Sequence, residues 1–169
     1  MAHAPPRTVE IAAYDPDWPR RFRALADRAA AALGDIVLSI EHVGSTAVPG
    51  LAAKPVIDLD VVVRPEDVEH AVRRLATLGY GHRGELGVPG RHAFRTPLGE
   101  AKHHLYVCVA GSEGLRDHLR FRDHLRTHPD AAREYAALKQ RLAERHRHDP
   151  DAYQEAKRAF IDALTRAAS

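Results

Sequence analysis

The chain has 169 residues, enough for one domain with a hydrophobic core of its own. Its formal net charge of +2 is too small an imbalance for a general nucleic-acid binder. No stretch approaches the ~20 apolar residues of a membrane span, and the N-terminus lacks the apolar segment of a secretory signal. The single cysteine, Cys108, excludes an internal disulfide. These features favour a protein of the reducing cytoplasm.

Helix and strand patterns alternate along the first part of the chain, after a leader over residues 1–8. Asp15 is a capping residue, and Pro16 suits the first helical position. Apolar residues then recur at helical spacing until Gly34 ends the pattern. β-Branched residues follow on both sides of a glycine-rich turn. The expected elements are a helix over 16–33, a strand over 36–43, a turn over 44–50 and a strand over 54–63.

The second part of the chain adds one helix and one strand and then becomes helical. Val68, Val72 and Leu75 share one helical face. A glycine-rich, basic section follows, and we expect it to form a short strand and a loop that carries Arg91 and Arg95. The expected elements are a helix over 65–78, the glycine-rich section over 79–99, a strand over 103–109 and three helices over 112–167, broken near Pro129 and Pro150.

These elements predict an α/β fold of the α+β type, with strands in front and helices behind. The sheet-containing core would span about 9–110, and the C-terminal helices about 112–167. No shift in composition marks a flexible linker between the two parts. We therefore expect a single domain over 1–169.

A pair of aspartates lies inside an apolar strand. Alternate residues of a strand point to the same face, so Asp58 and Asp60 project side by side. Burying two unpaired carboxylates is costly. A divalent cation removes that cost, since Mg²⁺ uses one or two carboxylates plus phosphate oxygens and water. The alternative is an exposed edge strand, but the apolar neighbours and the preceding turn favour a metal site.

The turn before this strand has the composition of a phosphate-binding site. Gly44 and Ser45 can offer backbone N–H groups and a hydroxyl to a phosphate. The turn is not a P-loop, because Gly44, Gly50 and Lys54 have the wrong spacing. It is not a nucleophile elbow either, because no Gly-x-Ser-x-Gly surrounds Ser45. Together with the aspartates, the turn predicts a phosphoryl- or nucleotidyl-transfer site.

The order of these motifs resembles the nucleotidyltransferase superfamily and, more closely, the GrpB family. The stretch IEHVGSTAVPGLAAKPVIDLDVVV, residues 40–63, carries the resemblance. Further similarity comes from YDPDWPRRF, HHLYV, FRDHLRTHP, EYAALK and YQEAKRAFI, so it covers nearly the whole chain. The resemblance implies a cytoplasmic protein with a nucleotidyltransferase-like mixed β-sheet, flanked by helices, and a helical C-terminal part.

Transferases of this superfamily usually complete the metal site with a third carboxylate on a neighbouring strand. The strand over 103–109 has none, but His104, Tyr106 and Cys108 share one of its faces. His104 is therefore the candidate third ligand or acid–base group, which would favour Mn²⁺ or Zn²⁺ over Mg²⁺. The alternative is a half-buried histidine bonded to its neighbours. We expect that structural role for His103 on the opposite face.

Basic side chains are candidates for neutralising bound phosphates. Arg122 falls inside the apolar arc of its helix, so it needs an acidic partner or a phosphate. Lys139 and Lys157 lie beside apolar residues of their helices, where they can reach the sheet or extend into solvent. The remaining candidates are Lys54 beside the turn, and Arg91 and Arg95 as a phosphate clamp or as solvated loop residues.

These features together predict a metal-dependent nucleotidyltransferase that moves a nucleotidyl group from a nucleoside triphosphate to a small-molecule acceptor. Asp58, Asp60 and His104 would hold Mg²⁺ or Mn²⁺, and Gly44 and Ser45 would hold the phosphates. Nucleic acid is not the expected acceptor, because the sequence has no long basic stripe. The alternatives are a nucleotide-binding accessory protein without turnover and a phosphohydrolase.

Overall fold

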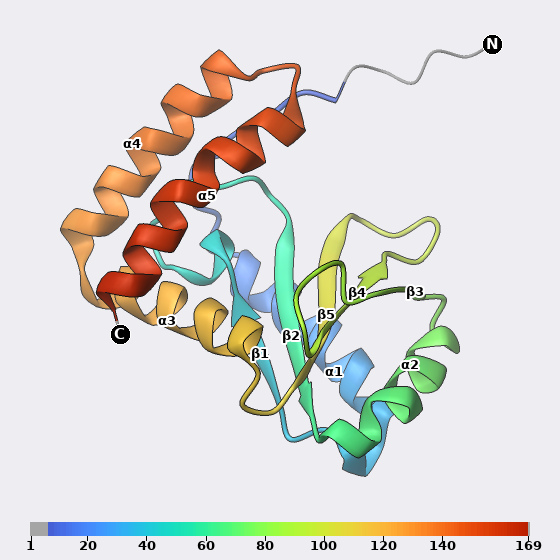
Figure 1. Ribbon diagram of the computed structural model, residues 1–169. Helices are drawn as coiled ribbons and strands as arrows, with labels where there is room; N and C mark the ends of the chain where they lie inside the picture. Colours follow the sequence, from blue (N-terminus) through green and yellow to red (C-terminus); the bar gives the residue numbers. More distant parts are fainter. Residues whose placement is uncertain (1–6, 169) are drawn as a thin grey trace.

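The valine-rich segment Ile57–Val63 forms strand β2 inside a mixed sheet (Figure 1). The structure is a computed structural model that describes residues 7–168, so most of the predicted leader over 1–8 lies outside the described residues. Strand β5 (His103–Val109) runs parallel to β2, and the other neighbouring strands are antiparallel. The order is β1-β2-β5-β4-β3, with β1 (Ser39–Val43), β3 (Gly81–Gly84) and β4 (Arg91–Arg95).

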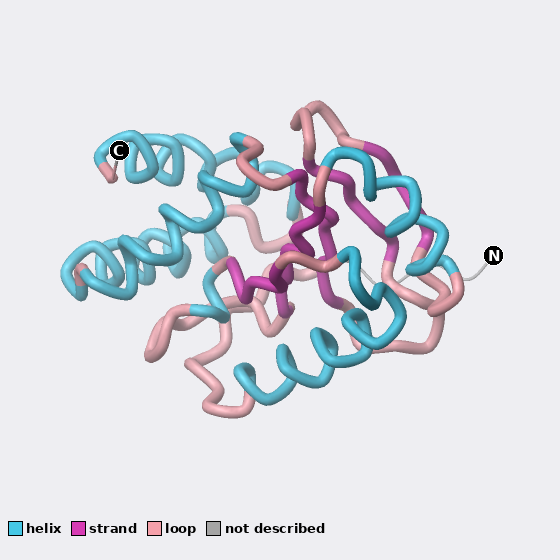
Figure 2. The backbone as a smooth tube through the Cα atoms, turned by 90° about the horizontal axis from the view of Figure 1, so that it is seen from below, coloured by secondary structure: helices cyan, strands magenta, loops and turns pink. Residues whose placement is uncertain are grey.

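Two helices, α1 (Trp18–Leu33) and α2 (Val68–Ala76), cover one face of the sheet. Figure 2 shows helices on both sides of the strands. Alternate residues of β2 point to the α1 and α2 side, so the valine-rich run supplies Leu59, Val61 and Val63 to this core. Its other members include Leu33, Leu75, Leu105 and Val107. Burial of this apolar face is the main source of stability for the sheet.

Helix α3 (Glu113–Thr127) packs on the other face, where Leu115 contacts Val62 and Cys108. Helices α4 (Pro129–Arg145) and α5 (Pro150–Ala167) pack on α3 and on each other at one end of the sheet (Figure 1). Their own core contains Phe121, Leu125, Tyr135 and Leu164. In the described part of the chain, none of the helices combines the length and the apolar character that crossing a membrane requires.

The predicted mixed sheet, flanking helices and helical C-terminal part are confirmed, but several boundaries were wrong. The strand predicted over 54–63 begins at Ile57, and the helix predicted over 65–78 spans Val68–Ala76, because 65–67 form a 3₁₀ turn. Helix α1 begins at Trp18 because Asp15 and Pro16 form a turn, in which the Asp15 side chain accepts a hydrogen bond from the N–H of Asp17. The strand predicted from residue 36 begins at Ser39, because 34–36 form a 3₁₀ turn.

The predicted loop position of Arg91 and Arg95 was also wrong. Both residues belong to β4, where Arg91 pairs with Cys108 of β5 and Arg95 pairs with Gly81 of β3. Hydrogen bonding to two neighbouring strands fixes this segment. The glycines at 87 and 90 instead lie in the connection that precedes β4.

We expect Leu59→Ala to destabilise the protein strongly, because Leu59 is 0% exposed in the centre of the sheet. Removing a buried leucine side chain costs about 2–5 kcal/mol through lost contacts and the cavity left behind. The control is Leu98→Ala, at a side chain that is 98% exposed, where a change within about 0.5 kcal/mol is expected. Urea denaturation of both variants measures the difference, and equal losses would contradict this assignment of the core.

Candidate functional site

A cleft opens between the sheet and the C-terminal helices. Its volume is about 510 Å³, and its walls come from the turn after β1, from β2 and β5, and from α3, α4 and α5. Asp58 and His104 face each other across β2 and β5, which pair in that register. All four lysines of the chain line this cleft: Lys54, Lys102, Lys139 and Lys157.

The turn at Gly44 lies directly against the Asp58 carboxylate. Gly44 has a φ of +74°, and a Cβ at this position would lie 2.3 Å from Asp58 Oδ2, so glycine is required. His42 supports the turn, because its Nε2 lies 2.9 Å from Thr46 Oγ1 and its ring stacks on Phe22 of α1. Burial lowers the pKa of His42 to about 4, so this ring is neutral at physiological pH.

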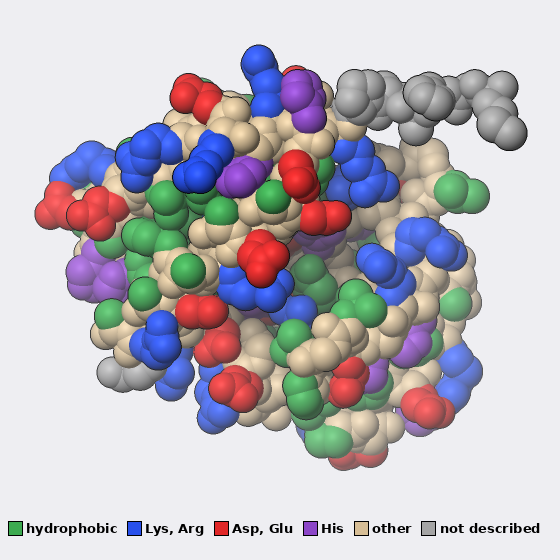
Figure 3. Space-filling model, turned by 45° about the horizontal axis from the view of Figure 1, so that its top comes forward, with side chains coloured by type: hydrophobic (Ala, Val, Ile, Leu, Met, Phe, Trp, Pro, Cys, Tyr) green, Lys and Arg blue, Asp and Glu red, His purple; other side chains and the backbone are tan. Residues whose placement is uncertain are grey.

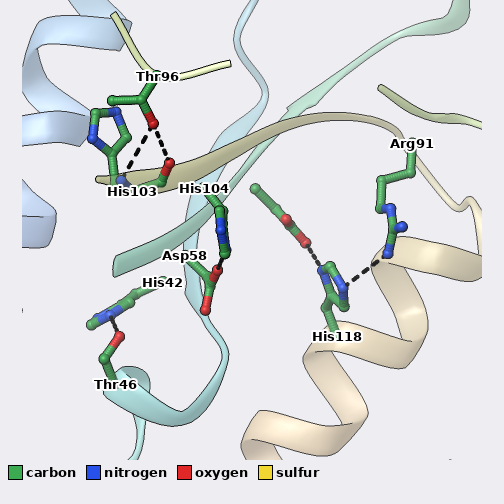
Figure 4. A network of polar contacts seen from close by, with 9 residues as sticks. His42, Thr46, Asp58, Arg91, Thr96, His103, His104 and His118 are labelled. Carbon is green, nitrogen blue, oxygen red and sulfur yellow. Dashed lines mark hydrogen bonds and ion pairs between the residues drawn. The ribbon is translucent and has the colours of Figure 1, made fainter. Parts of the chain in front are cut away.

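The two aspartates share one face of β2, as predicted, but their surroundings differ. Asp58 lines the cleft, and its Oδ1 lies 2.6 Å from His104 Nδ1 (Figure 4). Asp60 is 0% exposed and lies beneath the cleft wall, with its Oδ2 2.7 Å from His118 Nδ1. The alternative of two aspartates on an exposed edge strand was wrong, because β2 is an interior strand and Asp60 is buried.

A chain of polar contacts links Asp60 to Arg91 through His118 (Figure 4). Arg91 Nη1 lies 3.4 Å from His118 Nε2, and the guanidinium carbon lies 4.9 Å from the centre of the Tyr106 ring. Arginine can only donate, so His118 Nε2 accepts and its Nδ1–H donates to Asp60. Arg91 is thus linked to the buried carboxylate through the His118 ring.

The two carboxylates fit a divalent cation that brings further ligands with it. Asp60 Oδ1 is buried and accepts no hydrogen bond from an N–H or O–H group of the described residues, although the Cys108 thiol interacts with this carboxylate. A buried acceptor with so weak a partner costs free energy unless a ligand compensates it. Within residues 7–168, no three His, Cys, Asp or Glu side chains are gathered as a metal site. A cation between Asp58 and Asp60 would use Asp60 Oδ1, because His118 holds Oδ2, and would complete its coordination with phosphate oxygens and water.

Two tyrosine rings lie beneath the lysine ammonium groups. Lys54 Nζ and Lys157 Nζ lie 4.8 and 4.9 Å from the centre of the Tyr153 ring. Lys139 Nζ lies 4.7 Å from the centre of the Tyr135 ring, and Lys139 is 1% exposed. None of these three lysines forms an ion pair with a carboxylate of the described residues. The rings stabilise the ammonium groups only in part.

Burial lowers the pKa of each of these lysines. The pKa of Lys139 falls to about 7, with repulsion from Lys157 as the second cause. The pKa of Lys157 falls to about 8 through burial and repulsion from Lys54, although Asp58 opposes the shift. Burial and the neighbouring Lys102 also lower the pKa of Lys54. A bound anion would stabilise the charged form of these three lysines, although Asp58, Asp117, Asp151 and Asp162 also line the cleft.

The structure brings most of the predicted site residues together, but four of them do not line the cleft. Asp60 and Arg91 lie behind its wall, where both contact His118, and Arg122 and Arg95 lie elsewhere. Arg122 Nη1 donates to Glu41 Oε2 at 2.8 Å and to the His42 carbonyl oxygen at 3.2 Å, so it takes the ion-pair role. The Arg95 guanidinium lies against Gly81, away from the cleft. The predicted residues that line the cleft are Gly44, Ser45, Lys54, Asp58, His104, Lys139 and Lys157.

Three residues at the site were not predicted from the sequence motifs: Glu41, His118 and Lys102. Glu41 is a carboxylate on the neighbouring strand β1 and lies opposite Asp60, but it is paired with Arg122 and does not line the cleft. His118 reaches the site from α3, which no local pattern indicates. The available signal for Lys102 was the rarity of lysine. The chain has 25 Lys and Arg residues, all but four of them are arginine, and all four lysines line the cleft.

Comparison with known proteins shows bacterial relatives over most of the chain. It is 37% identical to UPF0157 protein YqkA of Bacillus subtilis, over 93% of this chain and 46% of YqkA. It is 42% identical to UPF0157 protein PA4798 of Pseudomonas aeruginosa, over 88% of this chain and 63% of that protein. The chain thus spans about half to two thirds of the length of these curated relatives.

A solved structure of GrpB from Enterococcus faecalis matches with a TM-score of 0.85 and 35% identity, over 94% of this chain and 96% of that chain. A structure of the Cid1 poly(U) polymerase matches with a TM-score of 0.48 and 14% identity, over 77% and 44%. This second likeness is too distant to say what the present chain binds. The family model described as GrpB protein matches residues 8–167. The resemblance found in the sequence is confirmed, and the chain belongs to the GrpB family.

Proposed function

We propose that this protein is a metal-dependent nucleotidyltransferase that moves a nucleotidyl group from a nucleoside triphosphate to a small-molecule acceptor. The observation that carries the proposal is the convergence of all four lysines with the Gly44–Ser45 turn and Asp58 in one cleft. Lys139 is buried and Lys54 and Lys157 are half-buried, all three without a carboxylate partner, so a polyanion would stabilise their charged forms. A triphosphate supplies that charge, and the turn would fix its position.

Different side chains of the cleft would bind the phosphates, neutralise charge and accept the proton during nucleotidyl transfer. Gly44 and Ser45 bind phosphate oxygens, while Lys139 and Lys157 neutralise charge that develops on the leaving pyrophosphate. An acceptor hydroxyl or amine attacks the α-phosphorus in line, the bond to the bridging oxygen breaks, and pyrophosphate leaves. His104 Nδ1 is held by Asp58, so its Nε2 is the ring nitrogen that can accept the proton of the acceptor.

The metal is part of this proposal. Asp58 and Asp60 would hold Mg²⁺ or Mn²⁺, with His104 Nε2 as the alternative third ligand. When bound, the cation would neutralise phosphate charge. Asp60 Oδ1, which accepts no hydrogen bond from an N–H or O–H group of the described residues, supports this assignment.

A second candidate function is nucleotide binding without turnover, as in an accessory protein. Its specific support is the burial of Asp60 behind His118, which leaves Asp58 as the single member of the pair on the cleft wall. A protein of this kind would bind a nucleoside triphosphate with little dependence on a metal.

We place either function in the cytoplasm, where nucleoside triphosphates are available and the single cysteine stays reduced. A small acceptor is preferred to nucleic acid. On the face drawn in Figure 3, basic and acidic side chains are interspersed, in contrast to the continuous basic track that nucleic-acid binding favours.

Asp58→Asn should abolish pyrophosphate release from a nucleoside triphosphate in the presence of Mg²⁺ or Mn²⁺, because the substitution removes the carboxylate that both orients His104 and reaches the cleft. We expect a loss of at least about 100-fold in rate with the fold retained. The measurement follows pyrophosphate, free phosphate and self-labelling with each nucleotide. The matched control is Asp162→Asn, an exposed carboxylate on the same cleft wall, which should keep the activity.

Three outcomes of this assay separate the functions. Pyrophosphate release that Asp58→Asn removes supports the transferase. Unchanged nucleotide binding without turnover in either protein favours the accessory function. Phosphate released without pyrophosphate or a labelled product would identify a hydrolase and contradict the transfer step.

The affinity of the cleft for ATP should fall as the pH rises from about 7.5 to about 9. Lys157, with a lowered pKa of about 8, loses its proton in this window, and Lys139, with a pKa of about 7, loses what remains of its charge, whereas the phosphate charge is already complete. We expect a decrease of at least about tenfold. Calorimetric titration at several pH values tests it, and Lys157→Met should flatten the profile.

The stability of the unliganded protein should change in the opposite direction. In the unfolded chain these lysines have the ordinary lysine pKa of 10.5, so the unfolded state binds more protons above about pH 7 and stability rises with pH. Thermal unfolding over the same pH range provides the measurement. A profile in which affinity and stability rise together would contradict the assignment of these pKa shifts.

A further inference from the structure

The aromatic rings of the cleft are already covered by other side chains. The Tyr153 ring lies against the ammonium groups of Lys54 and Lys157. The Tyr135 ring lies against Lys139, stacks on Phe160 and makes an edge contact with Phe121. Nucleotide bases are commonly held by stacking on an open aromatic face. These two buried rings offer no such face.

The third tyrosine of the cleft is occupied in the same way. The Arg91 guanidinium covers the Tyr106 ring, and the rings of His104 and His118 lie beside it at 6.4 and 5.7 Å between centres. Phe121 is buried and makes its edge contact with Tyr135. A base could therefore stack on Tyr135 or Tyr153 only by displacing an existing contact, whereas the half-buried Tyr106 and the 41% exposed His104 offer limited open ring surface.

Few side chains of the cleft could distinguish one nucleotide base from another by hydrogen bonding, and most of them are exposed. Gln154 and Asp162 line the mouth of the cleft, but both are exposed to solvent. Water competes for hydrogen bonds at exposed side chains, so such groups discriminate weakly between bases. Asp117 is half-buried on the cleft wall, and one carboxylate alone distinguishes few base edges.

The phosphate-binding groups, in contrast, are numerous and repeated. Helix α4 carries Tyr135 and Lys139, and helix α5 carries Tyr153 and Lys157, each pair four residues apart with the ammonium group over its own ring. Both pairs face the cleft. Helices α4 and α5 therefore each carry one Tyr–Lys pair of the same spacing, and both pairs place an ammonium group at the same cleft.

We propose that the cleft selects its donor by the polyphosphate chain and not by the base. The four common nucleoside triphosphates and inorganic triphosphate then bind with similar affinity, whereas adenosine and AMP bind far more weakly. The inference rests on the proposed function for the identity of the donor, and it names the part of that donor that the protein recognises.

Calorimetric titration of the full chain with ATP, GTP, CTP, UTP and inorganic tripolyphosphate tests the inference. We expect the five dissociation constants to agree within about threefold, and AMP to bind at least about 100-fold more weakly than ATP. A preference of more than about tenfold for one base overturns the inference. Failure of tripolyphosphate to bind where ATP binds, or absence of any binding, overturns it as well.

Variants identify the groups responsible. Lys139→Met and Lys157→Met should weaken all five ligands by the same factor, because each removes a charge from the phosphate subsite and leaves the base untouched. Arg158→Met is the matched control, since Arg158 is exposed on α5 next to Lys157 and lies outside the cleft lining, and it should leave every affinity unchanged. A loss confined to one nucleotide would overturn the inference.

Chemical footprinting of the protein without substitutions tests the inference even where a variant does not fold. All lysines of the chain line the cleft, so acetylation followed by mass spectrometry reports on this site. Tripolyphosphate should protect Lys54 and Lys157 as well as ATP does, and adenosine should protect neither. Protection by adenosine, or by ATP without tripolyphosphate, overturns the inference.

The two proposals fail in different ways. Equal binding of all five ligands without release of pyrophosphate leaves phosphate recognition intact and removes the transferase. Turnover with a strong preference for one nucleotide base supports the transferase and overturns recognition through the polyphosphate chain.

Discussion

A buried positive charge without a carboxylate partner is the constraint on which the cleft depends. Lys139 is 1% exposed, and its ammonium group is held by the Tyr135 ring and by the Ala52 carbonyl oxygen. These contacts replace only part of the water that the ammonium group loses on burial. The packing of α4 over the turn therefore keeps a cation in a place that an anion would stabilise.

The acidic groups of the sheet have the opposite arrangement, because each one has a basic partner. The pairs are Asp58 with His104, Asp60 with His118, and Glu41 with Arg122. The carboxylates are thus engaged by the sheet and α3, whereas the lysines around the tyrosine rings are not engaged by carboxylates of the described chain. This separation is what favours a polyanion in the proposed function, although the whole chain has a formal net charge of only +2 and Asp117, Asp151 and Asp162 also line the cleft. This preference fits the phosphate chain of a nucleotide better than its base.

The hydrophobic core and the site are coupled through the glycine turn. Phe22 of α1 stacks on His42, and His42 in turn contacts Thr46 of the turn. Gly44 brings the same turn against Asp58. The same strand β2 supplies Leu59 to the core on one face and Asp58 to the cleft on the other. Precise packing of β2 therefore also sets the geometry of the polar site.

The sequence by itself determined most of the elements, the alternation of β2 and the family, because these depend on local periodicity and on motifs in a fixed order. The period of two in β2 was sufficient to place Asp58 and Asp60 on one face. Only the tertiary structure decided that Asp60 is buried behind His118, that Arg91 and Arg95 belong to a strand, and that Arg122 pairs with Glu41. It also gathered four lysines from separate segments into one cleft. Such contacts join residues far apart in the chain, and their free energies depend on burial and partners that no local pattern contains.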